Sequence, residues 1–66
     1  MTLREKFLND ITDFLLRTGL NPTQFGRAAA HDPNFVHELR RGRDVGFNLY
    51  EQVNTFMQNW EPPTGG

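Results

Sequence analysis

Apolar residues return at intervals of three or four along the first part of the chain, which is the period of an α-helix. Thr2 is followed three residues later by Glu5, the spacing of a capping box at a helix start. Gly19 suits the left-handed position that follows a helix. The sequence therefore predicts a helix over residues 2–18. The apolar stripe on its buried face consists of Leu3, Phe7, Ile11, Phe14 and Leu15.

A second, shorter helix is predicted to open at Asn21-Pro22, because asparagine is a strong N-cap and proline is tolerated at the first helical position. It places Phe25 and Ala29 on one face. Gly26 in its interior costs about 1 kcal/mol relative to alanine. That cost indicates a neighbouring helix packed so closely that a side chain would block its approach.

The same start signal returns at Asp32-Pro33, where Asp32 is expected to cap a third helix. This helix is predicted to run to Arg41, with Gly42 in the left-handed position after it. Because only two residues separate it from the second helix, the two helices are expected to turn sharply against each other.

A fourth helix is predicted from near Gly46-Phe47 to about Asn59 or Trp60, and it is apolar on two overlapping faces. One face comprises Leu49, Val53, Phe56 and Trp60, and the other comprises Phe47, Tyr50, Val53 and Met57. Two interpretations stay open. Either one face fills the core and the other meets a second copy of the chain, or both faces wrap around one small core.

With 66 residues, of which 36% are hydrophobic, the chain is expected to form one globular domain. No segment alternates apolar and polar residues in the manner of a strand, so the predicted fold class is all-α. The absence of cysteine excludes disulfides and cysteine-ligated zinc. Apolar runs of at most three residues are too short for a membrane span or a signal peptide. The domain is expected over residues 1–60, followed by a disordered Pro/Gly-rich tail at 61–66.

The positive charge of the chain is concentrated in one segment. The net charge is −1, yet residues 27–43 carry +2 and the rest of the chain carries −3. The cations of that segment are all arginines, namely Arg27, Arg40, Arg41 and Arg43. The dipole of the third helix favours cations at its end, which accounts for Arg40 and Arg41 but does not require Arg43.

A wheel of the third helix at 100° per residue separates a dry side from a wet side. Phe35, Val36 and Leu39 form the dry side, with Phe35 at the edge of the core. The wet side and its flanks hold Pro33, Asn34, His37, Glu38 and Arg41. Such groups read base edges in the major groove of DNA, where arginine pairs with guanine, asparagine with adenine, and glutamate accepts from cytosine. The alternative interpretation is an ordinary solvated helix face.

The spacing of apolar, small and basic residues across the two short helices resembles the helix-turn-helix of the lambda-repressor-like (Cro and phage-repressor type) DNA-binding family. The residues that carry the resemblance are Phe25, Gly26, Ala30, Val36, Leu39, Gly42 and Arg43. It covers roughly residues 20–57. The chain departs from the family pattern at Pro22, where a glutamine is usual, at Ala30, where glycine is frequent, and at Asp32-Pro33, a less usual start for a recognition helix.

The resemblance implies a compact domain of four or five helices with its helix-turn-helix at about residues 21–42. The third helix would then enter the major groove with its N-terminal part leading. Base readout would fall to Pro33, Asn34, His37, Glu38 and Arg41, with Pro33 against a thymine methyl group. Phosphate contacts would fall to Asn21, Thr23, Arg27, Arg40 and Arg43.

The resemblance further implies a transcriptional regulator, a repressor, that acts as a homodimer on a palindromic site, with recognition helices about 34 Å apart. It favours Phe47, Tyr50, Val53 and Met57 as the core face of the fourth helix. That assignment leaves Leu49, Phe56 and Trp60 for a dimer interface. Such a protein would be cytoplasmic and encoded by a bacterium or a phage.

The expected partners are double-stranded DNA and a second copy of the chain, with no membrane, small-molecule ligand, metal or cofactor. His31 and His37 are not spaced to face one another on a helix, and no nucleophile, base and orienting group converge, so an enzyme is not expected. The alternative is a small helical protein–protein interaction module, such as an adaptor or an antitoxin-like partner, that does not bind DNA. Steep salt dependence of duplex binding would favour the DNA interpretation.

Overall fold

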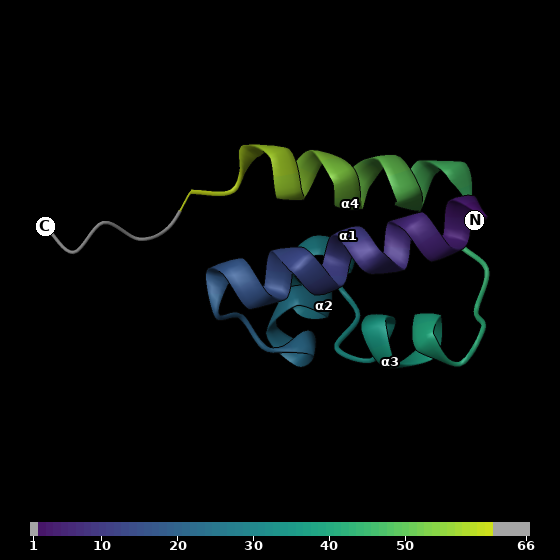
Figure 1. Ribbon diagram of the computed structural model, residues 1–66, viewed down its shortest axis with the longest axis horizontal. Coiled ribbons are helices and arrows are strands. Elements are labelled where there is room, and N and C mark those ends of the chain that lie inside the picture. Colours follow the sequence, from purple (N-terminus) through teal and green to yellow (C-terminus); the bar gives the residue numbers. More distant parts are fainter. Residues whose placement is uncertain (1, 62–66) are drawn as a thin grey trace, which may run out of the picture.

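Four helices make up the fold in the computed structural model, which describes residues 2–61 (Figure 1). They are α1 (Leu3–Thr18), α2 (Pro22–Ala30), α3 (Phe35–Arg40) and α4 (Phe47–Asn59). No strand occurs within the described residues, so the predicted all-α class is confirmed.

The predicted caps fix both ends of the first helix and the start of the second. The Thr2 hydroxyl accepts a hydrogen bond from the Glu5 N–H at 3.1 Å, and Gly19 ends α1 with a φ of 79°. Asn21 and Gln24 form a reciprocal capping box at the start of α2. Its two hydrogen bonds measure 2.8 and 3.1 Å. These ends therefore follow from local signals in the sequence.

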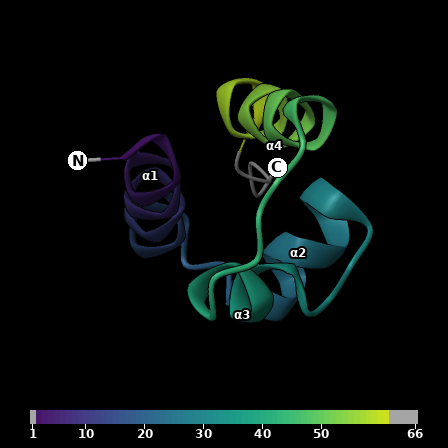
Figure 2. The same cartoon turned by 90° about the vertical axis from the view of Figure 1, so that its right-hand side faces the viewer.

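The long helices α1 and α4 lie side by side and run in the same direction (Figure 1). Ring contacts join them at both ends: Phe7 and Tyr50 have centroids 4.7 Å apart, and Phe14 and Trp60 have centroids 5.6 Å apart. An end-on view shows α2 and α3 on the remaining side, so that all four helices surround one interior (Figure 2). α3, the shortest of these helices, lies at one edge of the molecule.

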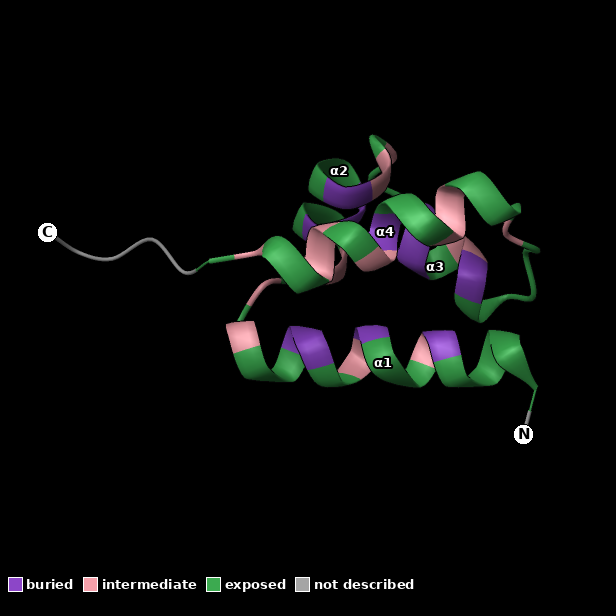
Figure 3. Cartoon of the chain, turned by 90° about the horizontal axis from the view of Figure 1, so that it is seen from above, coloured by how far each residue is buried: buried purple, intermediate pink, exposed green. Residues whose placement is uncertain are grey.

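One hydrophobic core receives side chains from every helix. Its buried members are Phe7, Ile11, Phe14, Leu15, Phe25, Ala29, Phe35, Val36, Leu39 and Val53. The buried positions of α1 follow one side of that helix (Figure 3), which confirms its predicted stripe except at Leu3, which is 65% exposed. Half of the six residues of α3 belong to the core, so burial fixes which side of α3 faces solvent.

α4 uses both of its apolar faces for the same core. Phe56 has its ring centroid 5.7 Å from that of Phe25 and 6.2 Å from that of Phe14. Leu49 and Trp60 also pack partly buried against the core. The prediction that Phe47 is a core residue is wrong, since Phe47 is 75% exposed at the first position of α4. The interpretation in which both faces wrap around one core agrees with these contacts better than a division into a core face and an outward face.

Trp60→Ala should therefore lower the stability of the isolated monomer, because Trp60 packs edge-on against Phe14. We expect a loss of about 0.5–3 kcal/mol in the free energy of unfolding, measured by chemical denaturation at several protein concentrations. Sedimentation of the same variant separates this from the interface hypothesis. Weaker self-association with unchanged monomer stability would assign Trp60 to a dimer interface instead.

A further prediction concerns the C-terminal tail. The predicted disordered tail at 61–66 lies outside the described residues except for Glu61, which is exposed and follows α4 without regular structure. The core thus ends with the last turn of α4 and the partly buried Trp60.

Candidate nucleic-acid interface

The connection between α2 and α3 passes directly over Gly26. His31 ends α2 in the left-handed conformation with a φ of 57°, and the N–H of Asp32 donates to the Gly26 carbonyl at 3.1 Å. A Cβ atom at Gly26 would lie 2.3 Å from the carbonyl oxygen of Asp32 and 3.3 Å from the Cβ of Phe35. The predicted close approach at Gly26 is confirmed, and the element that approaches is the turn into α3 together with the first residue of that helix.

α3 begins later than the sequence predicts. Its first helical residue is Phe35, and Asn34 precedes it without a side-chain cap hydrogen bond. Asp32 does not cap the helix. Its Oδ1 instead accepts the N–H of Asn34 at 2.9 Å, and its carbonyl accepts the N–H of Phe35 at 3.1 Å. Aspartate bonds to the backbone two residues on in such a turn, so Pro33 and Asn34 form a turn that leads into α3.

The end of α3 is closed by a Schellman motif. The N–H of Arg43 donates to the Glu38 carbonyl at 3.0 Å, and the N–H of Gly42 donates to the Leu39 carbonyl at 3.1 Å. Gly42 has a φ of 113°, which confirms the predicted left-handed glycine. Arg4 reaches from α1 and donates through Nη2 to the Leu39 carbonyl at 3.4 Å. The Leu39 carbonyl thus accepts hydrogen bonds both from the residue that follows the end of α3 and from α1.

The buried side of α3 determines what its other side presents. Phe35, Val36 and Leu39 are each 0% exposed, so Phe35 lies inside the core and not at the predicted edge. Residues of the predicted wet side lie on the surface: Pro33, Asn34, His37 and Arg41 are exposed, and Glu38 is partly buried. An amide, an imidazole and a guanidinium therefore share one accessible surface over α3 and its two ends.

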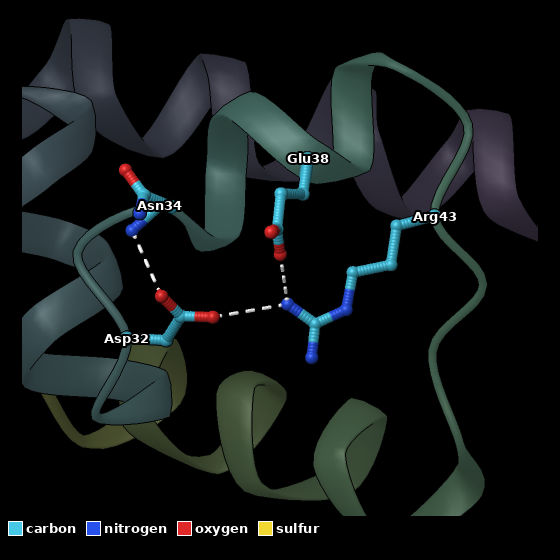
Figure 4. A network of polar contacts seen from close by, with 4 residues as sticks. All are labelled: Asp32, Asn34, Glu38 and Arg43. Atoms are coloured by element: carbon cyan, nitrogen blue, oxygen red, sulfur yellow. Dashed lines mark hydrogen bonds and ion pairs between the residues drawn. The ribbon is translucent and has the colours of Figure 1, made fainter.

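Arg43 joins two carboxylates on one flank of that surface (Figure 4). Its Nη1 lies 3.0 Å from Asp32 Oδ2 and 2.5 Å from Glu38 Oε2. Its guanidinium carbon also lies 5.9 Å from the centroid of the Phe35 ring. We call Asp32, Glu38 and Arg43 the Arg43 cluster. It spans α3, because its members precede, occupy and follow the helix.

The protonation states of the Arg43 cluster follow from its hydrogen bonds. The backbone N–H of Asn34, and then the guanidinium of Arg43, lower the pKa of the Asp32 carboxyl below its ordinary value of 3.8. The side-chain hydrogen bond to Asp32, with a further one to Glu38, raises the pKa of Arg43 above its ordinary value. Asp32 and Arg43 are therefore both charged at neutral pH, and their attraction is partly screened by solvent.

The sequence assigns Glu38 to base readout and Arg43 to a phosphate, whereas the structure engages both with each other. Sequence reasoning does not pair them, because charged residues five positions apart in a chain meet only if the backbone reverses between them. The glycine at position 42 followed by an arginine is the signal that could reveal the pair. In a Schellman motif the residue after the glycine returns to the third residue from the helix end.

The predicted phosphate contacts fall into two groups. Asn21 uses its side-chain oxygen in the α2 cap, and Arg43 is held in its cluster. Thr23, Arg27 and Arg40 are exposed, and none of these arginines forms an ion pair within residues 2–61. Arg27 on α2, and Arg40 and Arg41 at the end of α3, are therefore exposed cations that can meet an anionic partner.

No protein-family model, curated protein or solved structure matches the chain. Within residues 2–61, no helix combines the length and the apolar character needed to cross a membrane. In the same range, no three histidine, aspartate or glutamate side chains gather where they could hold a metal ion. A functional proposal therefore depends on the surface of α3 and on the turns beside it.

Proposed function

We propose that this protein binds double-stranded DNA sequence-specifically, with α2 and α3 acting as a helix-turn-helix of the lambda-repressor-like type. α3 is the recognition helix and lies in the major groove. One observation carries the proposal: Phe35, Val36 and Leu39 are completely buried, while Asn34, His37 and Arg41 are exposed. A short helix packed against the core in this way can present polar groups to base edges.

The chemistry of the exposed groups supports direct readout. The Arg41 guanidinium matches the O6 and N7 acceptors of guanine, and the Asn34 amide matches the N6 and N7 atoms of adenine. Asn34 lies at the start of α3 and Arg41 at its end, so the two residues address different base pairs. His37 lies between them and is exposed. Pro33 precedes Asn34 and is exposed, and we propose that it contacts a thymine methyl group.

The charge of the protein supports a regulator whose affinity for DNA comes from specific base contacts and from binding as two copies. With a net charge of −1 and few free cations near α3, non-specific attraction to DNA is weak. Two copies on a palindromic site would place two α3 helices about 34 Å apart and double the specific contacts. A dimeric transcriptional regulator is the role that fits this balance, and we propose that it acts as a repressor.

Selection of bound duplexes from a random pool tests the proposed function directly. We expect enrichment of a palindromic sequence, and binding of the selected duplex that weakens steeply as salt increases. A non-palindromic scrambled duplex of equal length serves as the control. If the pool yields no enriched sequence, and duplex binding at low salt does not exceed that of the scrambled control, the proposed function is wrong.

Arg41→Ala should cost about 1–3 kcal/mol of specific binding free energy and relax base preference at one position of the selected site. The measurement is titration of the variant against the selected duplex and against duplexes changed at single base pairs. Arg17→Ala removes the same charge from α1 and should leave the base preference unaltered. An unchanged preference in Arg41→Ala would remove Arg41 from the reading residues.

A second candidate function is a protein–protein interaction module. Three large apolar side chains favour it, because Leu3, Leu16 and Phe47 are 65%, 80% and 75% exposed. They lie on α1 and at the start of α4. Duplex binding that is absent or insensitive to salt, together with a tight complex disrupted by Phe47→Ala, would favour this module over the DNA-binding domain.

A further inference from the structure

The Arg43 cluster lies beside the proposed reading surface but has geometry unlike that of a contact residue. Asp32 is in the turn before α3, Glu38 is inside α3, and Arg43 follows α3. A single guanidinium nitrogen of Arg43 bonds to both carboxylates (Figure 4). The cluster therefore ties the two ends of α3 together along one flank of the helix.

A six-residue helix needs such ties. An isolated helix of this length is unstable in water, because nucleation costs more than a few hydrogen bonds return. The three buried side chains hold α3 against the core, but they act on one side only. The Arg43 backbone adds a second link, since its N–H donates to the Glu38 carbonyl while its side chain binds the Glu38 carboxylate. Arg43 therefore binds Glu38 through both its backbone and its side chain.

We propose that Arg43 is a positioning residue that fixes the pose of α3 and, by engaging Glu38, restricts base reading to the remaining exposed side chains of this surface. This inference rests on the proposed DNA-binding function. Arg43 uses only Nη1 for both carboxylates, so a phosphate contact would fall to its Nε and Nη2 groups, and the two carboxylates beside it would repel an anionic backbone. Cytosine readout by Glu38 would fall to its other oxygen, Oε1, while the ion pair through Oε2 holds the carboxylate toward Arg43. The side chains of Asn34, His37 and Arg41, by contrast, form no ion pair within residues 2–61.

Charge-balanced double variants separate a positioning arginine from a phosphate-binding arginine. Glu38→Gln/Arg43→Gln removes the pair, and Arg40→Gln/Glu51→Gln removes an exposed arginine together with an exposed glutamate from α4. Both keep the net charge at −1. The probe is the duplex selected by the wild-type chain, and the readout is the slope of log K against log salt concentration.

We expect the cluster variant to keep the wild-type salt slope and the Arg40 variant to lose about one unit of it, the contribution of one phosphate contact. A loss of about one unit in the cluster variant would overturn the inference, because Arg43 would then contact a phosphate. The base preference of a single variant is the second measurement. Glu38→Gln alone should relax no position of the site, and relaxation at a single position would show that Glu38 reads a base.

Amide hydrogen exchange of the free protein tests the positioning role without DNA. We expect the amides of α3 to exchange several-fold faster in Glu38→Gln/Arg43→Gln than in the wild-type chain, and at the wild-type rate in Arg40→Gln/Glu51→Gln. Unchanged exchange in the cluster variant would show that Arg43 does not fix α3. If the wild-type chain binds no duplex, the proposed function fails by itself, and the exchange rates still decide whether Arg43 positions α3.

Discussion

Gly26→Leu should abolish the native packing of α2 against the turn into α3. The first atom of the new side chain would lie 2.3 Å from the backbone carbonyl oxygen of Asp32, a separation that requires the backbone to move. Overpacking in cores costs about 1–3 kcal/mol, and a clash with backbone leaves little room for relief. A domain of this length has roughly 3–10 kcal/mol of stability, from about 0.05–0.15 kcal/mol per residue. Circular dichroism and thermal unfolding measure the loss.

Two companion variants sharpen that experiment. Ala28→Leu adds a leucine to the exposed side of the same helix and should change stability by no more than about 0.5 kcal/mol. Gly26→Ala sets two effects against each other, because alanine gains about 1 kcal/mol of helix propensity but meets the Asp32 carbonyl. Net destabilisation by Gly26→Ala is the expected sign. A stabilised Gly26→Ala variant would mean that α3 does not dock closely at this position.

Local signals allow both ends of α1 and the start of α2 to be predicted from the sequence. Thr2, Gly19 and Asn21 each satisfy a terminal backbone group, or adopt a conformation, that depends only on neighbours within a few residues. The sequence also identifies Gly26, since a glycine inside a helix has a cost that close packing explains. The caps depend only on neighbouring residues, and the glycine stands out by its local cost, so both can be predicted from the sequence.

Other features are decided by tertiary packing and escape the sequence. Periodicity gives α4 two overlapping apolar faces, and only the positions of α1 and α2 determine that Phe56 is enclosed while Phe47 is exposed. His31 occupies the left-handed turn position, where glycine or asparagine is the usual signal. Asp32 illustrates competition between two local roles, since the same carboxylate can cap a helix or close a turn two residues on.

Some features of the candidate site can likewise be predicted from the sequence, and others depend on tertiary packing. Which side of α3 is exposed follows from the spacing of Val36 and Leu39, and the sequence predicts it. Which exposed charges are free does not follow from spacing. Glu38 and Arg43 lie on the surface, yet each is engaged with the other once the chain turns at Gly42. A helical wheel describes one helix and contains no information about the residues that return to it from the following loop.

Phe25→Ala should be among the most destabilising single changes in the chain. Phe25 is 0% exposed, and its ring centroid lies 5.5 Å from that of Phe14 and 5.7 Å from that of Phe56. It therefore joins α2 to both α1 and α4. Truncation of a buried phenylalanine to alanine costs about 3–5 kcal/mol, which is comparable to the entire stability of a domain this small. Denaturant unfolding should show a largely unfolded variant at 25 °C.

The same deletion at Phe47 provides the matched control. Phe47 is 75% exposed, so Phe47→Ala removes an equal number of atoms from the surface and should change stability by no more than about 0.5 kcal/mol. Phe25→Leu keeps most of the apolar volume and should fold with an intermediate loss. If Phe25→Ala and Phe47→Ala unfolded at the same denaturant concentration, Phe25 would not be the residue that joins three helices. Other core residues would then anchor α2, and with it the turn into α3.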